Sequence, residues 1–252
     1  MDDRPGLPLE EFDGHEEGML QPRPLVVEGT FPPAAVVCFF AEAARELQDA
    51  GGLVRIGQFS DEMGGRPIYA TPDRAVAVFH PGVGGPLSAH SLEQAIASGA
   101  RRFIAVGGAG SLVESFGQGD VMVVETAVRD EGTSFHYLPP SRVVHFDTAE
   151  TQRLTAGLAA LGVPSSLGTT WTTDADFRET RTRIERRRAE GCVAVEMEAA
   201  SLAAVSRFHG VQHGHLLYSG DSLHGPEWTE RSWTTSTRRA QLLEAGITLS
   251  RA

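Results

Sequence analysis

Two glutamates lie two residues apart in an otherwise apolar segment, "AVEMEAASLAAV" (194–205). The segment contains Glu196 and Glu198 but no lysine or arginine that could pair with them. Because burying an unpaired carboxylate is costly, both residues need an explanation. A carboxylate only accepts hydrogen bonds, which suits it to binding a pair of sugar hydroxyls. The alternative, a carboxylate that caps a helix N-terminus, accounts for one glutamate but not for both.

A second pair of reactive residues, Asp221 and Arg231, follows the apolar run 215–220. An aspartate at the end of a buried strand is a candidate general acid, because burial raises the pKa of a carboxyl group. The alternative is a turn or helix cap, which is the commoner use of aspartate. Arg231 begins the expected last helix and could reach back to this carboxylate. The two residues would then place opposite charges at one leaving-group site.

Glycines follow two of the expected strands. Gly82, Gly84 and Gly85 stand in "HPGVGGPLSA" directly before an expected helix, and Gly107 and Gly108 open "GGAGSL". Glycine lets backbone N–H groups approach an anion or a sugar at a helix N-terminus. One such turn is common in α/β proteins, but two at the ends of successive strands would face the same cleft. We therefore expect Gly84, Gly107 and Gly108 to contact a ligand.

These motifs are positioned by an alternation of strands and helices. Short apolar runs predict strands that are buried on both faces. Helical patterns between them predict an α/β/α sandwich of three layers around a largely parallel sheet, in which ligands bind beyond the carboxyl ends of the strands. The expected strands are 25–28, 75–79, 103–107, 121–128, 193–197 and 215–220, and the expected helices are 34–51, 86–100, 179–190, 196–210 and 230–246.

Composition narrows the class of protein. The 252 residues carry a formal net charge of -11, which argues against a nucleic-acid backbone as the main partner. No apolar run approaches the ~20 residues of a membrane span, so we expect no membrane partner. Residues 1–24 are acidic and lack the features of a secretory signal. We expect a soluble, cytoplasmic protein in which this tail precedes one catalytic domain, residues 25–252.

The cysteines and histidines predict no metal site. Cys38 and Cys192 stand in apolar contexts, typical of reduced core thiols. No cysteine pair, HExxH motif or cluster of cysteines and histidines is present. We therefore expect no metal and no cofactor.

Taken in order, the glycine turns, "VAVEMEAASL", "SGDS" and "TERSWTT" resemble the nucleoside phosphorylases of the trimeric/hexameric type and their uridine phosphorylase and nucleosidase relatives. "AVRDEGTSFHYLPPSR" and "GTTWTTDADFRETR" are also similar to members of that superfamily, and the resemblance covers about residues 25–250. It implies a single α/β domain with a mixed, barrel-like central sheet. It also implies a homo-oligomer assembled from dimers, with a hexamer as one form.

The resemblance also implies roles for the motif residues. Glu198 would accept hydrogen bonds from the ribose 2′- and 3′-hydroxyls, Met197 would pack under the sugar, and Glu196 would lie beside it. Asp221, backed by Arg231, would protonate the departing base. The implied reaction cleaves the N-glycosidic bond of a nucleoside, with phosphate as the acceptor and co-substrate.

Two aromatic side chains have alternative interpretations. Phe177 could stack on the base, or it could be a core aromatic residue. His136 could contact the 5′ end of the sugar or a partner subunit, or it could be a structural histidine. Asp221 favours a purine or a modified base, because purine N7 can be protonated as the bond breaks. The segment after "TTDADF" reads "RETRTR" and lacks the Gln-x-Arg pair typical of uracil-specific members.

The resemblance weakens at the phosphate site. Gly29 stands where the family has a Gly-Asp-Pro-x-x-Arg turn, but no arginine follows it. Ala105 and Gly108 replace a second arginine and a hydroxyl residue, and Arg45 alone matches a family arginine, one that reaches a neighbouring subunit's phosphate. Each charged hydrogen bond is worth roughly 1.5–3 kcal/mol. Losing two arginines would therefore weaken phosphate binding by on the order of 10²–10⁴.

Three readings of the activity follow. Phosphorolysis to free base and ribose 1-phosphate comes first on family grounds, with Arg129 or Arg178 as substitutes for the missing arginines. In the second, water is the acceptor and Glu28 is the nearest candidate base. In the third, from a different class, the protein binds a nucleoside without catalysis.

Overall fold

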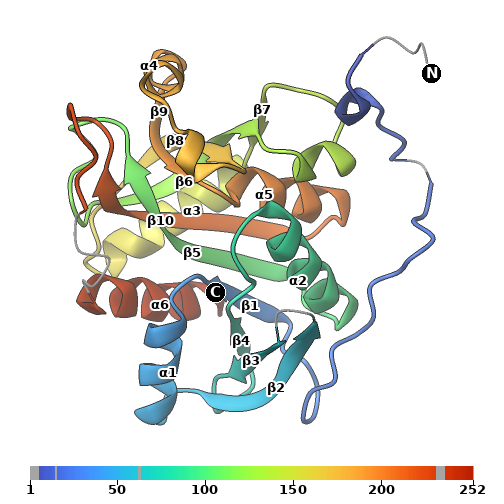
Figure 1. The fold of residues 1–252 in the computed structure, drawn as a ribbon. Coiled ribbons are helices and arrows are strands. Elements are labelled where there is room, and N and C mark those ends of the chain that lie inside the picture. Colours follow the sequence, from blue (N-terminus) through green and yellow to red (C-terminus); the bar gives the residue numbers. More distant parts are fainter. Residues whose placement is uncertain (1–5, 15, 62–63, 231–235, 252) are drawn as a thin grey trace.

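One mixed sheet runs through the computed structural model, which describes all residues except 1–5, 15, 62–63, 231–235 and 252 (Figure 1). In the described residues it has ten strands: β1 (Ala34–Cys38), β2 (Val54–Asp61), β3 (Gly64–Ala70), β4 (Val76–Phe79), β5 (Arg102–Ser111), β6 (Val121–Asp130), β7 (Val143–His145), β8 (Ser165–Thr173), β9 (Cys192–Glu196) and β10 (Gln212–Ser222). The α-helices are α1 (Ala41–Asp49), α2 (Gly85–Ala97), α3 (Thr148–Ala160), α4 (Arg181–Ala189), α5 (Ala199–Phe208) and α6 (Ser236–Ser250). Three 3₁₀ turns, η1 (Pro8–Glu10), η2 (Thr133–His136) and η3 (Asp176–Arg178), complete the described elements.

Part of the sheet closes on itself. Strand β5 pairs with both β9 and β10, and β10 leads through β6 and β8 back to β9. These five strands therefore form a closed ring, and β1, β4, β3 and β2 extend the sheet from the other pairing of β5. The predicted mixed, barrel-like central sheet is confirmed.

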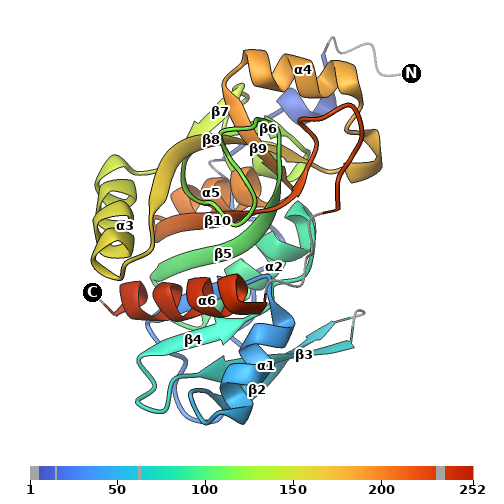
Figure 2. The ribbon, with the colours of Figure 1, turned by 90° about the vertical axis from the view of Figure 1, so that its left-hand side faces the viewer.

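Helices cover both faces of the sheet (Figure 2). Apolar residues of α1, α3 and α6 pack on one face, against Val36, Val78 and Val106 among others. Residues of α2 and α5 pack on the opposite face, against Ala35, Phe79 and similar side chains. Successive residues of β1 thus point into two different cores, which is why this strand is a continuous apolar run. The predicted three-layer sandwich is confirmed.

The expectation for residues 25–51 is wrong in detail. Residues 25–28 form no strand; Val27 makes only an isolated bridge with Gly57. The first strand is β1, inside the segment expected as one long helix, and the helix α1 starts at Ala41. The run "AAVVC" is rich in small and β-branched residues that fit a strand buried on both faces, and its length agrees with a strand better than with a helix.

The other strand expectations are confirmed as β4, β5, β6, β9 and β10, and the other helix expectations as α2, α4, α5 and α6. The last helix continues past Gly246, where it was expected to end. A Cβ on this glycine would lie 3.1 Å from a methyl of Val106, so Gly246 allows α6 to approach the sheet closely. The elements that the sequence patterns did not predict are the β2–β3 hairpin, β7, β8 and α3.

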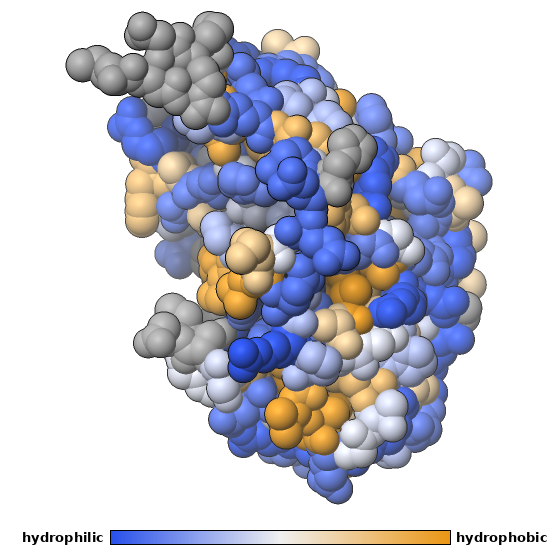
Figure 3. Space-filling view, turned by 90° about the vertical axis from the view of Figure 1, so that its right-hand side faces the viewer, coloured by the Kyte–Doolittle hydropathy of each residue, from blue (hydrophilic) through white to orange (hydrophobic). Residues whose placement is uncertain are grey.

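The amino-terminal segment lies along the outside of the molecule (Figure 1). Hydrophilic side chains cover most of the face that it crosses, and hydrophobic ones gather there in small patches (Figure 3). Among the described residues, no helix is long and apolar enough to cross a membrane.

Four strands end at the same edge of the sheet. Strand β5 runs parallel to β1 and β10, and β1 runs parallel to β4. Their carboxyl ends therefore meet at one edge, and parallel pairing of β8 with β9 brings the Glu196 end of β9 beside Thr172.

Candidate active site

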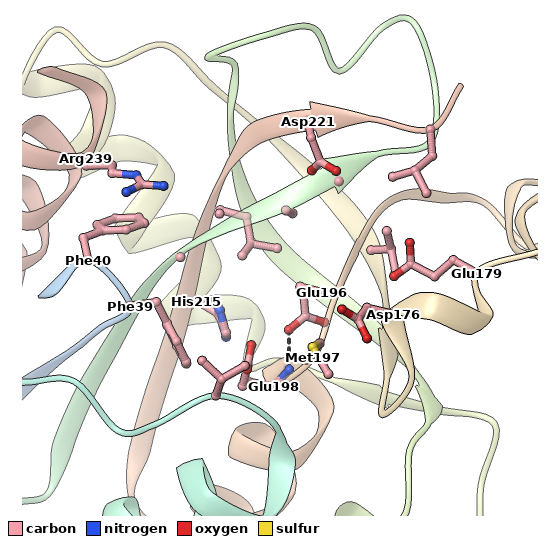
Figure 4. Close-up of a pocket in the computed structure, with 18 of the residues that line it drawn as sticks. Phe39, Phe40, Asp176, Glu179, Glu196, Met197, Glu198, His215, Asp221 and Arg239 are labelled. Carbon is pink, nitrogen blue, oxygen red and sulfur yellow. Dashed lines mark hydrogen bonds between the residues drawn. The ribbon is translucent and has the colours of Figure 1, made fainter. Parts of the chain in front are cut away.

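A cavity of about 620 Å³ opens at this edge of the sheet (Figure 4). Its walls come from the segments that follow β1 and β4, from the carboxyl halves of β5, β9 and β10, and from η3 and α6. The lining residues are Phe39, Phe40, His80, Val83, Gly107–Gly110, Asp176, Phe177, Glu179, Val195–Glu198, His215, Leu217, Asp221, Leu223, Trp228 and Arg239. Motifs far apart in the sequence thus meet around one space.

Glu196 fixes the start of α5. Its Oε2 accepts hydrogen bonds from the backbone N–H groups of Glu198 (2.7 Å) and Ala199 (2.6 Å), at the N-terminus of that helix. Its Oε1 accepts a hydrogen bond from the hydroxyl of Thr172 on β8 at 2.6 Å. Two orphan donors of the helix are satisfied in this way, and the positive end of the helix dipole faces the carboxylate. Glu196 therefore has a structural explanation that needs no ligand.

Glu198 is held in the cavity wall. It occupies the N-cap position of α5, and its Oε1 accepts a hydrogen bond of 2.6 Å from the backbone N–H of Gly84. Gly84 has a φ of +86°, a conformation that favours glycine, and it precedes α2. Burial raises the pKa of Glu198, and the nearby charge of Glu196 raises it further. Glu198 thus stands ready to exchange a proton or hydrogen bonds with a ligand.

Asp221 lies at the far end of the same cavity, near the end of β10. It is buried, and its Oδ2 accepts a hydrogen bond of 2.6 Å from the indole N–H of Trp228. Arg231, its expected partner, lies outside the described residues. Asp221 and the two glutamates of the opening motif therefore line one cavity.

Glu179 is a lining residue that the sequence analysis missed. It follows η3, at the same side of the cavity as Asp221 (Figure 4). Burial raises its pKa to about 8, and the charges of Asp221 and Asp176 contribute to the increase. At neutral pH the Glu179 carboxyl group is therefore protonated and can donate a hydrogen bond. Its place two residues after Phe177, in an acidic turn, was the available signal.

Phe39, Phe40 and His80 line another part of the cavity. Phe39 and Phe40 follow β1, and His80 follows β4 with its ring edge-on to Phe39 at 5.8 Å. The Nδ1 atom of His80 accepts a hydrogen bond from the backbone N–H of Gly82 at 3.0 Å, so its proton is on Nε2. Burial and the charge of Arg66 lower the pKa of His80, which keeps the imidazole neutral.

Arg239 is the one arginine or lysine among the described residues that line the cavity. Its guanidinium is already bound to Glu42, and its Nε donates a hydrogen bond of 2.8 Å to the hydroxyl of Tyr218. The lining carboxyl groups are those of Asp176, Glu179, Glu196, Glu198 and Asp221. The cavity is therefore strongly acidic, and its single cation is paired.

Some of the other residues predicted to bind a ligand line the cavity, and one does not. Met197, Gly107 and Gly108 line the cavity, as does Phe177, whose side chain is 95% exposed at its rim and is not a core aromatic. His136 lies in η2, is exposed and does not line the cavity. The expected contact of His136 with a sugar within this chain is not supported by its position.

The expected phosphate-binding role of Gly29 is contradicted by its position. Gly29 precedes β1 and packs near Arg74, which precedes β4. Both residues lie at the amino ends of parallel strands, at the opposite edge from the cavity. Glu28 forms an ion pair with Arg74 at 3.8 Å, so the sequence hypothesis of a water-activating Glu28 is wrong for the same reason.

The three arginines considered for phosphate lie away from the cavity lining. Arg45 is exposed on α1. Arg129 is buried elsewhere, where it donates hydrogen bonds to Ser134, Ser141 and backbone carbonyls. Arg178 lies in η3 with its side chain exposed. Within this chain, neither Arg129 nor Arg178 replaces the arginines that are missing after Gly29 and at Ala105.

Comparison with known proteins agrees with this geometry. The family model described as the phosphorylase superfamily matches residues 33–250. The chain belongs to the phosphorylase superfamily. Its curated relatives include uridine phosphorylase of Salmonella typhimurium (27% identical, covering 56% of this chain and 61% of the relative) and that of Thermococcus kodakarensis (30% identical, 55% of each). A DeoD-type purine nucleoside phosphorylase of Exiguobacterium sibiricum is 29% identical over 70% of this chain and 77% of the relative.

The chain thus spans about six tenths of the length of the uridine phosphorylases that it matches. Two solved structures share the fold. AMP nucleosidase from Bacteroides thetaiotaomicron has a TM-score of 0.71 at 20% identity, with 88% of this chain and 89% of that chain covered. A futalosine hydrolase mutant of Helicobacter pylori has a TM-score of 0.69 at 16% identity, with 86% and 98% covered.

Proposed function

We propose that this protein cleaves the N-glycosidic bond of a nucleoside and transfers the sugar to water, which releases a free base and a free pentose. The observation that carries the proposal is the charge distribution of the cavity. Five carboxyl groups line it, and its one described arginine is bound to Glu42. Such a cavity suits a developing sugar cation and a neutral nucleophile.

Glu198 is the proposed sugar ligand. One of its oxygens is held by the backbone of Gly84, which leaves the other free to accept hydrogen bonds from ribose hydroxyls. In the transition state the sugar resembles an oxocarbenium ion. The developing positive charge favours the ionised form of Glu198, whose pKa is otherwise raised by burial and by Glu196. The carboxylate stabilises the cation more than it stabilises the neutral substrate, and this difference lowers the barrier.

The proposed base site lies between Asp221, Glu179 and Phe177. Negative charge develops on the base as the bond breaks, and a protonated carboxyl group nearby can neutralise it. Phe177 at the rim offers a flat surface for stacking. An acidic site of this kind favours a base with N–H donors or a basic ring nitrogen, so a purine or a modified base is the proposed substrate class. The reaction requires no cofactor.

Water is the preferred acceptor on electrostatic grounds. A phosphate dianion would be repelled by those lining carboxyl groups that are ionised, and it would have to compete with Glu42 for Arg239. Phe39, Phe40 and His80 belong to the neutral part of the lining, and the paired guanidinium of Arg239 lies over the Phe40 ring, 5.4 Å from its centroid. Water carries no charge and meets no such penalty.

Phosphorolysis is the second candidate, and two observations favour it. The matched curated relatives are phosphorylases by name. Arg239 also lines the cavity and would become available to phosphate if Glu42 took a proton or moved. In that case the products would be a free base and a pentose 1-phosphate.

The deciding experiment is a panel of purine, pyrimidine and modified nucleosides, assayed with and without phosphate. We expect base to be released at the same rate in phosphate-free buffer, with a reducing pentose as the second product. Release only in the presence of phosphate, with a sugar 1-phosphate as product, would establish phosphorolysis instead. Tight binding of a nucleoside without any product would select a binding protein.

A further inference from the structure

His215 is a buried imidazole in the lining of the cavity. It lies on β10, where it pairs in register with Ala105 of the parallel neighbour β5. Its side chain is 1% exposed and lines the cavity. A methyl group added at Gly107 would lie 3.9 Å from its Nε2 atom, so the missing side chain at Gly107 leaves this nitrogen open to the cavity.

No side chain holds this imidazole. In the described part of the chain, Nδ1 of His215 and both ring nitrogens of His213 are buried without a hydrogen-bond partner. The rings of His213 and Phe146 lie 5.8 and 6.3 Å from the His215 ring. Nε2 of His215 is not among these enclosed atoms, so Nε2 is the ring nitrogen that a ligand in the cavity can reach.

The surroundings keep His215 neutral. Burial lowers the pKa of His215 well below its ordinary value, and His213 lowers it further. A neutral imidazole with its proton on Nδ1 has a free lone pair on Nε2. That atom can accept a proton but cannot bind a dianion as a cation would.

The positions of His215, Glu198 and Asp221 determine which face of a bound sugar would meet His215. In Figure 4, His215 lies beside Glu198 and Phe39, whereas Asp221 and Glu179 lie across the cavity. A pentose bound to Glu198 with its base toward Asp221 would therefore turn the opposite face of its anomeric carbon toward His215. This is the face that an incoming nucleophile must attack.

We propose that His215 binds the attacking water molecule and accepts its proton, as general base of the hydrolysis proposed above, on which this inference rests. The water oxygen forms a bond to the anomeric carbon as the bond from that carbon to the base nitrogen breaks. The bonding electrons leave with the base, which is protonated on the Asp221 side. The attacking oxygen becomes positively charged and strongly acidic as its bond to the anomeric carbon forms, so its proton can pass to the weakly basic Nε2 of His215 and then to solvent.

The test uses two substitutions at this position and the best nucleoside from the panel. In H215Q we expect kcat to fall by about 10²–10³-fold, the usual contribution of a general base, while KM changes little. In H215A we expect a similar loss, together with partial recovery of kcat when imidazole is added, because the vacated space can admit it. A purely structural role would not give imidazole rescue.

His213 provides the matched control on the same strand. It is buried two residues away but does not line the cavity, and both of its nitrogens lack partners. In H213L we expect no loss of kcat beyond about 3-fold, because removing His213 raises the pKa of His215 and does not weaken it as a base. We also expect an unchanged or higher Tm, because an apolar side chain replaces unpaired polar atoms.

The outcomes separate this inference from the proposed function. If the original protein releases base only with phosphate, hydrolysis itself fails. If it hydrolyses without phosphate but H215Q and H215A retain full kcat, the role of His215 is overturned and the proposed function stands. Loss in the His215 variants without imidazole rescue would also count against the proposal.

Discussion

Glu196 and Glu198 are close in sequence but differ in what surrounds them. Glu196 is enclosed by donors from β8 and the start of α5, whereas Glu198 has one backbone donor and a face open to the cavity. The sequence pattern indicated that one glutamate would be structural and one would face a ligand. Only the contacts could show which elements satisfy Glu196.

E198Q should lower kcat/KM by on the order of 10²–10³ without loss of fold. The amide oxygen of glutamine can still accept the hydrogen bond from Gly84, but the negative charge beside the sugar cation is removed. Steady-state kinetics would measure kcat/KM of E198Q, and circular dichroism would show whether it is folded.

E196Q is the matched comparison. It should also lower Tm, because the Glu196 side chain caps α5 and loss of such a cap costs about 0.5–2 kcal/mol. Normal turnover in E198Q would contradict the proposed sugar contact.

Glu179 predicts a dependence of stability on pH. Its pKa is about 8 in the folded protein, above its ordinary value of 4.5. Between these values the folded state holds a proton that the unfolded state has released, so the free energy of unfolding falls as pH rises. E179Q has no such proton to lose. Its Tm relative to the original protein should therefore be higher at pH 8.5 than at pH 5, by differential scanning fluorimetry. An equal difference at both pH values would contradict the pKa of Glu179.

His215 illustrates what sequence reasoning could not supply at the residue scale. Alternation along β10 places His215 and Leu217 on one side of the strand, and both line the cavity. The sequence alone predicts this alternation of side chains along the strand. It does not predict the absence of hydrogen-bond partners, because that absence depends on Phe146 and on β5, which are distant in sequence.

At the scale of elements, the cavity depends on how β8 and α5 are joined. The Thr172 hydroxyl donates to Glu196 and accepts a hydrogen bond of 3.0 Å from the backbone N–H of Ala200. One side chain thus connects a strand to the first turn of the helix that carries Glu198.

T172V should therefore lower the free energy of unfolding by about 1–3 kcal/mol, since it leaves buried groups without a partner. It should also lower kcat, because the position of Glu198 depends on the start of α5. Chemical denaturation and kinetics would measure both effects. T170V is the control: Thr170 is on the same strand, is also buried, and contacts Glu196 only at 3.4 Å, so its effect should be smaller. Equal effects of the two variants would contradict a special role for Thr172.

The elements differed in how well their sequences predicted them. Strands buried on both faces, such as β4 and β5, are continuous apolar runs, and their predictions were correct. β8 reads "SSLGTTWTT", in which threonines with buried hydroxyls make the strand look polar. The boundary between β1 and α1 was missed because one apolar run, "AAVVCFFAEAA", serves both a strand and a helix.

At the scale of the whole molecule, the alternation of strands and helices in the sequence predicted the α/β fold class. The same alternation did not predict that five of the strands close into a ring. Closure depends on the pairing of β5 with β10, whose partners are about a hundred residues apart. No local pattern in either strand specifies that pairing. The family resemblance predicted a barrel-like sheet. The structure shows which five strands form it.

We also propose that the protein assembles from dimers, as the family resemblance implies. Arg45 is exposed on α1 and has no place in its own chain's cavity, so any contact it makes with a ligand must be with that of another subunit. Light scattering coupled to size exclusion should give an even multiple of the monomer mass. A monomer that remains fully active would contradict this assembly.

The contact between Trp228 and Asp221 has an optical consequence. An indole whose N–H donates to a carboxylate emits differently from one that has lost that acceptor, and Trp228 is 56% exposed at the edge of the proposed base site. A base that binds to Asp221 changes the acceptor that the indole N–H meets, whether it shares the Oδ2 atom or displaces the indole from it. The chain therefore carries its own fluorescent reporter of occupancy, against which inactive variants such as E198Q could be titrated with unlabelled nucleosides.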